Sequence, residues 1–124
     1  MATTSGAAPN TQDIEKMVRD YQMLQEQLRN SALQLDQLHG AKADLDRAKS
    51  EIDKAEGKVY LTVGGVIVET SKEKAQADIK ERSELTDVRI QSATKQYNEL
   101  KTREKQLGEK ITSIYQQGRP QPGA

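Results

Sequence analysis

Apolar residues recur at alternating spacings of three and four along two long segments of this chain, a repeat typical of a coiled coil. In the first segment the repeat runs from Ile14 to Ile52, where nine of twelve positions are apolar. Ser31, Lys42 and Lys49 interrupt this stripe, although Ala41 and Ala48 lie beside the two lysines and can shift it locally. In the second segment the repeat ends at Ile114, with eight of twelve positions apolar. Because a short connector joins the segments, we expect two antiparallel helices in which position i faces roughly position 128 − i.

The composition argues against a conventional globular core. Only 34% of the 124 residues are hydrophobic and 31% are charged, and Phe, Trp and Cys are absent, whereas a compact domain carries about 45–50% apolar residues. The lack of cysteine excludes disulfides and cysteine-ligated metal. Without a phosphate-binding glycine loop or a cysteine nucleophile, we expect no enzyme, no cofactor and no metal site.

Charge and hydropathy also restrict the partners. Nineteen basic and nineteen acidic residues cancel, so no strong overall field attracts nucleic acid or an anionic membrane. The apolar stretches are much shorter than the ~20 residues that span a bilayer, and the first residues lack the basic start and apolar run of a signal peptide. These features favour a soluble cytoplasmic protein that binds neither nucleic acid nor membrane.

A short segment rich in β-branched residues separates the two helices. Gly64-Gly65 lies between two such runs, and a two-residue glycine loop suits the turns that join antiparallel strands. The expected cross-strand pairs are Val63 with Val66, Leu61 with Val68, and Val59 with Thr70.

This hairpin carries more apolar surface than one chain can cover. An isolated two-stranded hairpin is marginal in water, and its open edges favour pairing with other strands. We therefore expect an obligate oligomer in which hairpins from several chains form a barrel or stacked sheets. The alternative is a hairpin that folds flat onto its own coiled coil. The expected oligomerisation residues are Val59, Leu61, Val63, Gly64, Gly65, Val66, Ile67 and Val68.

The sequence predicts five consecutive regions. They are a flexible tail at 1–10, a coiled-coil helix at 11–57, a β-hairpin at 58–70, a second coiled-coil helix at 71–117 and a flexible tail at 118–124. Asn10 is expected to cap the first helix, and Thr70 with Glu73 has the spacing of a capping box for the second. Gly57 and Gly118 are expected to end the helices in the left-handed conformation.

The centre of the sequence resembles that of prefoldin, and specifically its β-type subunits. The resemblance rests on Val59-Tyr60, Val63-Gly64 and Ile67-Val68, followed by Lys72-Glu73-Lys74-Ala75. The two helices of equal length around a single hairpin extend it over nearly the whole chain, and the single hairpin indicates the β type because the α type has two. The implied fold is mainly α, a long antiparallel two-helix coiled coil whose hairpin joins an intersubunit β-barrel platform.

The resemblance also implies a function and its partners. It implies a heterohexamer of two α-type and four β-type subunits that holds unfolded client proteins at the coiled-coil tips without ATP. Such a hexamer delivers its clients to a group II chaperonin. The alternative function is a structural coiled-coil adaptor that oligomerises through its hairpin and binds one folded partner.

In this topology the beginning of the first helix and the end of the second form the free tip. Terminal turns fray because they have neighbours on one side only, so apolar side chains there are available to a non-native client. The other interpretation is that these are ordinary seam residues. The expected client-binding residues are Ile14, Met17, Val18, Tyr21, Leu107, Ile111, Ile114 and Tyr115.

Overall fold

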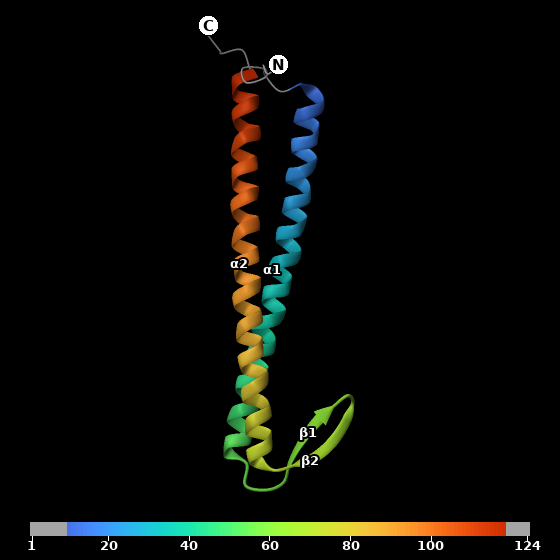
Figure 1. The fold of residues 1–124 in the computed structure, drawn as a ribbon, viewed down its shortest axis with the longest axis vertical. Coiled ribbons are helices and arrows are strands. Elements are labelled where there is room, and N and C mark those ends of the chain that lie inside the picture. Colours follow the sequence, from blue (N-terminus) through green and yellow to red (C-terminus); the bar gives the residue numbers. More distant parts are fainter. Residues whose placement is uncertain (1–9, 119–124) are drawn as a thin grey trace, which may run out of the picture. The chain divides into compact units, whose positions relative to one another are not determined.

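The computed structural model describes residues 10–118, which form two long helices joined by a two-stranded antiparallel hairpin (Figure 1). This is the mainly helical fold that the sequence predicts. The elements are α1 (Thr11–Lys54), β1 (Val59–Val63), β2 (Val66–Thr70) and α2 (Lys72–Gly118). Apart from Asn10 and Gly118, the tails predicted at 1–10 and 118–124 lie outside the described residues.

The chain divides into two compact units, which are described separately. The terminal unit contains residues 10–31 and 96–118, so the beginning of α1 pairs with the end of α2. The hairpin unit, Ala32–Lys95, contains the end of α1, both strands and the beginning of α2. In the part of the chain that the structure describes, no helix has an apolar stretch long enough to cross a membrane.

The coiled-coil repeat correctly predicts which side chains turn inward in both units. Nearly every predicted seam position is buried or half-buried, and the two exceptions are Lys49 and Gln76. Their neighbours Ala48, which is half-buried, and Ala75, which is completely buried, take these places. At these two positions a small side chain therefore replaces a long polar one. The shift expected from Lys42 to Ala41 is wrong, since Lys42 is half-buried and Ala41 is exposed.

The core is thin and lies mainly in the hairpin unit. The buried apolar residues there are Val59, Ala75, Ile79 and Ala93. Thr86 is also buried in this unit, whereas in the terminal unit the one buried residue within the described range is Ser31. The terminal unit is thus held by side chains that remain partly exposed to water.

Polar contacts between the helices agree with the predicted register to within one turn. In the hairpin unit, Lys42 Nζ lies 3.0 Å from Asp87, and Gln76 Nε2 donates a 2.9 Å hydrogen bond to Asp53. In the terminal unit, the hydroxyl of Tyr21 donates a 3.3 Å bond to the carboxylate of Glu104 across the helix pair.

The hairpin register is the predicted one. Val59 pairs with Thr70, Leu61 with Val68, and Val63 with Val66. Gly64 and Gly65 have φ angles of 54° and 81°, and positive φ at both loop positions is the requirement of a type I′ turn. The prediction from the Gly-Gly pair is confirmed.

The helix ends are predicted only in part. The Asn10 cap is confirmed, since its Oδ1 accepts a 2.8 Å bond from the Asp13 amide. The Thr70 cap is wrong: Ser71 Oγ instead accepts a 3.1 Å bond from the Lys74 amide, because Thr70 is still paired in β2. The Gly57 stop is also wrong, since α1 ends at Lys54 and Gly57 does not have a positive φ.

Candidate functional site

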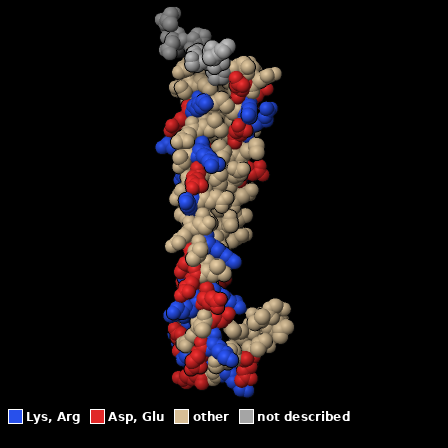
Figure 2. Space-filling view, in the orientation of Figure 1, with Lys and Arg blue, Asp and Glu red and all other residues tan. Residues whose placement is uncertain are grey.

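The hairpin exposes large apolar side chains on both of its faces. Val66 and Ile67, which are adjacent and therefore point to opposite faces, are 61% and 71% exposed. Figure 1 shows the two strands standing away from the helices of the hairpin unit, and Figure 2 shows the projecting hairpin almost free of charge. The alternative in which the hairpin folds flat onto its own helices is therefore wrong.

Only the base of the hairpin is covered by its own chain. Val59 is 8% exposed, and its neighbours on the same face, Leu61 and Thr70, are half-buried. The remaining predicted oligomerisation residues are exposed. They are Val63, Gly64, Gly65, Val66, Ile67 and Val68, and Tyr60 is exposed with them.

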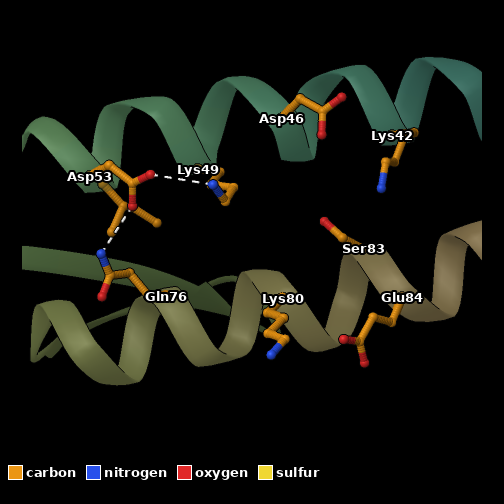
Figure 3. Close-up of a pocket in the computed structure, with 9 residues that line it drawn as sticks. Lys42, Asp46, Lys49, Asp53, Gln76, Lys80, Ser83 and Glu84 are labelled. Atoms are coloured by element: carbon orange, nitrogen blue, oxygen red, sulfur yellow. Dashed lines mark hydrogen bonds and ion pairs between the residues drawn. The ribbon is translucent and has the colours of Figure 1, made fainter.

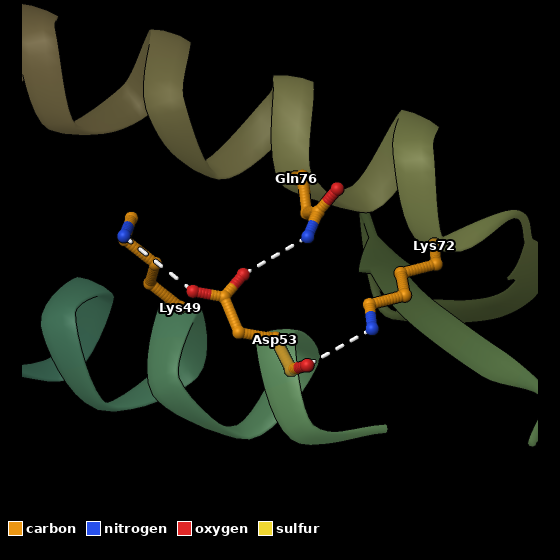
Figure 4. Close-up of polar contacts among 4 residues, drawn as sticks. All are labelled: Lys49, Asp53, Lys72 and Gln76. Atoms are coloured by element: carbon orange, nitrogen blue, oxygen red, sulfur yellow. Dashed lines mark hydrogen bonds and ion pairs between the residues drawn. The ribbon is translucent and has the colours of Figure 1, made fainter. Parts of the chain in front are cut away.

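The ammonium group of Lys72 anchors the hairpin base to the end of α1. Lys72 is the first residue of α2, and its Nζ donates to the main-chain carbonyls of Asp53 at 2.9 Å and Ala55 at 3.4 Å (Figure 4). These carbonyls belong to the last turn of α1 and its extension, where a helix leaves its acceptors unpaired and favours a cation. The sequence does not reveal this contact, because a main-chain acceptor has no residue signature.

The side chain of Asp53 completes this cluster. Its carboxylate accepts the hydrogen bond from Gln76 and lies 3.5 Å from the Nζ of Lys49 (Figures 3 and 4). The hydrogen bond from Gln76, followed by the positive charges of Lys49 and Lys72, lowers the pKa of Asp53 below its ordinary value of 3.8. The side chain of Asp53 is 44% exposed, so water screens these interactions.

A groove of about 400 Å³ lies between α1 and α2 beside this cluster (Figure 3). Its wall is apolar at Ile52 and carries charges of both signs, including Lys42 and Glu84. Within the described residues, no group of three or more His, Asp or Glu side chains is arranged to hold a metal ion.

The structure brings the predicted tip residues together in the terminal unit. Tyr115 is 55% exposed. The other seven are half-buried, namely Ile14, Met17, Val18, Tyr21, Leu107, Ile111 and Ile114. Half-burial means that each of these residues is partly covered by the protein yet keeps part of its surface in contact with water. Met23, which is 59% exposed in the same unit, is a further apolar side chain that the seam analysis did not identify.

Tyr21 packs where α2 has no side chain. A Cβ placed on Gly108 would lie 3.0 Å from the ring carbon Cε1 of Tyr21, closer than ordinary van der Waals contact. An open groove of about 400 Å³, lined by both polar and apolar surface, adjoins the ring. Gly108 was not singled out from the sequence, although a glycine inside a helical repeat costs about 1 kcal/mol relative to alanine and thereby indicates a packing role.

A further group of exposed apolar residues lies on the helices of the hairpin unit. Leu33 of α1 and both Leu85 and Val88 of α2 are about half exposed or more. They lie outside the seam, and single exposed apolar residues are common on protein surfaces.

Comparison with known proteins agrees with the observed fold. A family model described as "Prefoldin subunit" matches residues 15–118. The chain is 33% identical over 100 residues to prefoldin subunit beta of Methanosarcina acetivorans, covering 79% of this chain and 86% of that protein. It is likewise 33% identical over 103 residues to prefoldin subunit beta of Pyrococcus abyssi, with the same coverage.

A solved structure shares both the fold and the sequence pattern. The crystal structure of the prefoldin beta subunit from Thermococcus strain KS-1 superposes with a TM-score of 0.78 at 30% identity, covering 90% of this chain and 96% of that one. The long helices and the single hairpin are thus the architecture of a known subunit type. The chain belongs to the prefoldin family of chaperones, as a subunit of the β type.

Proposed function

We propose that this chain is a subunit of an ATP-independent holdase that captures unfolded proteins at the ends of its helices. In this proposal two α-type and four β-type subunits form a hexamer through their hairpins. The hexamer works in the cytoplasm and delivers its clients to a group II chaperonin. The chain itself catalyses no reaction and uses no cofactor.

The exposed apolar hairpin is the observation that carries the proposal. Val63, Val66, Ile67 and Val68 leave nearly half or more of their surface in water, although exposed apolar patches on a stable protein usually mark interaction sites. Both strand edges also have unpaired main-chain groups, because the described sheet has two strands only. Strand pairing with hairpins of other subunits would satisfy both the apolar side chains and the edges.

The terminal unit supplies the client contacts in this proposal. Met17 and Tyr115 suit promiscuous binding, since methionine adapts its shape and tyrosine combines an apolar ring with a polar hydroxyl. Each helix end offers only a small, half-buried apolar area, so a single subunit binds weakly. Several subunits that contact one unfolded chain together gain affinity through their high effective concentration.

A fourfold serine variant tests the client site. Met17, Val18, Ile114 and Tyr115 are replaced together, which removes apolar surface from both helices of the terminal unit. We expect the hexamer to keep its mass while its ability to suppress aggregation of guanidinium-denatured citrate synthase falls at least about tenfold, because multivalent binding multiplies the losses at each tip.

A matched variant distinguishes tip residues from apolar residues in general. Replacing Leu33, Leu85 and Val88 with serine removes apolar side chains from the hairpin unit that are about as exposed as Tyr115 and more exposed than Met17, Val18 and Ile114. This control is expected to suppress aggregation like the unmodified chain. If the fourfold variant suppresses aggregation as well as the unmodified chain does, the helix ends are not the client site.

The alternative function is a structural coiled-coil adaptor. The exposed Leu85 and Val88 favour it, because they provide an apolar surface on the side of α2 for a specific partner helix. An adaptor binds one folded partner and ignores denatured proteins. Light scattering with several unrelated denatured proteins separates the two functions: a holdase lowers it for all of them, and an adaptor for none.

A further inference from the structure

The ring of Tyr21 and the missing side chain of Gly108 fit together in the terminal unit. The notch at Gly108 leaves just enough room for the ring, since an added Cβ would lie 3.0 Å from Cε1 and 3.5 Å from both Cζ and the hydroxyl oxygen. The hydroxyl then reaches the carboxylate of Glu104, one turn earlier on α2, at 3.3 Å. One side chain of α1 is therefore held by two neighbouring turns of α2.

This contact has no counterpart among the residues nearer the helix ends. Ile14, Met17, Ile111 and Ile114 are half-buried apolar side chains. Among residues 10–118, no side-chain hydrogen bond joins the two helices between Tyr21 and the beginning of α1. Apolar contacts alone let one helix shift along the other, whereas a hydrogen bond combined with a fitted ring holds the two helices at one position. Separation of the helices, which starts at their frayed ends, therefore meets its first specific obstacle at Tyr21.

We propose that Tyr21, Gly108 and Glu104 form a latch that sets the inner limit of the segment whose helices separate to receive a client. Tyr21 is then a positioning residue that holds the helices together, and the client contacts lie outward of it, at residues such as Met17, Val18 and Tyr115. The consequence for clients rests on the proposed holdase function, whereas the latch itself depends only on the packing of the terminal unit.

Two glycines provide a matched pair of variants. Gly108 and Gly40 both lie inside long helices, but a Cβ on Gly40 meets nothing within 4 Å. Alanine therefore improves helix propensity equally at both positions and meets a neighbouring ring only at 108. Glutamine, a longer helix former, adds further atoms beside the Tyr21 ring at 108, whereas at 40 its Cβ again meets nothing within 4 Å.

Hydrogen exchange of the full-length chain detects opening of the latch through the amides of α1, the helix that faces Gly108. The amides of residues 17–25, around Tyr21 in α1, exchange faster when the two helices separate. Because the substitution lies in α2, its effect on helix propensity does not act on these amides directly. We expect Gly108→Ala to speed their exchange about twofold or more and Gly108→Gln to speed it further. Gly40→Ala and Gly40→Gln are expected to leave exchange on the helix facing them unchanged.

The conservative variants separate ring packing from the hydrogen bond. Tyr21→Phe keeps the ring in the notch and loses the bond to Glu104, so its exchange rates are expected to lie between those of the unmodified chain and Gly108→Gln. Combining Gly108→Ala with Tyr21→Leu removes the ring that the new methyl group meets. In this background the added alanine is expected to slow exchange rather than speed it.

Client capture measures what the latch does. With the latch opened by Gly108→Gln, more of the seam becomes accessible, and we expect half-maximal suppression of citrate synthase aggregation at about half the usual chaperone concentration. Unchanged exchange at 17–25 in the Gly108 variants would overturn the latch. Faster exchange with unchanged capture would overturn its role as the limit of client access.

The same measurements test the latch and the proposed function independently. If neither the unmodified chain nor any variant suppresses aggregation, the holdase function is wrong. Faster exchange restricted to the Gly108 variants then still supports the latch as a structural element of the terminal unit.

Discussion

The hairpin and the helix ends are made of the same kinds of apolar residues, but they differ in how much their own chain covers them. In the hairpin unit, Ile67 is 71% exposed on a sheet with open edges. In the terminal unit, Ile111 and Ile114 are half-buried against the facing helix. In the function proposed above, the hairpin is therefore the surface that other subunits cover, whereas the helix ends are already partly covered by each other and would exchange that contact for a client.

This difference in coverage supports the proposal that the two exposed apolar surfaces of one chain have different roles. A surface that its own chain cannot cover is suited to lasting assembly, because leaving the assembly exposes all of it to water. A half-covered surface removes only its remaining exposed apolar area from water when it binds, so its contacts are weak and reversible. The hairpin corresponds to the first case and the helix ends to the second.

The largest expected effect comes from a charge on the hairpin. Ile67→Asp places a carboxylate where we propose that another subunit packs, and an uncompensated buried charge costs about 3 kcal/mol or more. The association constant is therefore expected to fall at least about a hundredfold, which native mass spectrometry detects as loss of the hexamer. Leu33→Asp puts the same charge on an exposed helix position and should leave the mass unchanged; a stable hexamer of the Ile67 variant would contradict the assembly role.

A second experiment compares the packing of the two units directly. Ile79 is 6% exposed in the hairpin unit, whereas Ile111 is half-buried in the terminal unit. We expect Ile79→Ala to lower the free energy of unfolding by about 2–4 kcal/mol and Ile111→Ala by roughly half as much, because less apolar area is lost there. Chemical denaturation of the full-length variants measures both values.

The two isoleucine variants serve as controls for each other. Each replaces isoleucine by alanine in α2, so the change in helix propensity is the same and cancels in the comparison. An equal loss at both positions would mean that the terminal unit is packed as tightly as the hairpin unit, which would remove the basis for reversible client contacts.

A smaller effect, of opposite sign, is expected at Ser31. Its side chain is 6% exposed, and its hydroxyl has no hydrogen-bond partner among the described residues. Ser31→Ala removes an unsatisfied polar group and is expected to raise the free energy of unfolding by about 1 kcal/mol. Ser50→Ala, at an exposed position of the same helix, is expected to gain about 0.5 kcal/mol from helix propensity alone, so a smaller gain at Ser31 would argue against this explanation.

The smallest expected effect is the pH dependence of Asp53. Its pKa is lowered in the folded chain by the hydrogen bond from Gln76 and by Lys49 and Lys72. A lowered pKa stabilises the fold above the ordinary value of 3.8, and this contribution is lost as the pH falls through the folded-state value. Thermal unfolding of Asp53→Asn should therefore differ from that of the unmodified chain at neutral pH and converge with it in acid. A difference that persists in acid would mean that the Asp53 charge is not the cause.

The backbone arrangement could be predicted from the sequence because local rules agree with one another. The repeat identifies the inward-facing residues, and Gly64-Gly65 determines the hairpin register. One error lies where two residues compete for one role. Thr70 and Ser71 can both cap a helix, and the sequence does not reveal that Thr70 is still paired in β2.

The missed contacts are those that depend on which residues meet across the helix pair. The repeat gives the register to within one turn, whereas the fit of Tyr21 to Gly108 requires the register to the residue. The bond from Lys72 to the Asp53 carbonyl depends on where α1 ends, which the sequence placed three residues too late. Both contacts depend on side-chain positions that the repeat alone does not give.

Hydrogen exchange of residues 59–70, measured together with the mass of the particle, tests the central claim most directly. With an α-type partner present, we predict a particle of six subunits in which the hairpin amides are protected, and rapid exchange of the same amides when the chain is diluted to a monomer. A folded monomer at micromolar concentration whose hairpin amides are already fully protected would contradict the account.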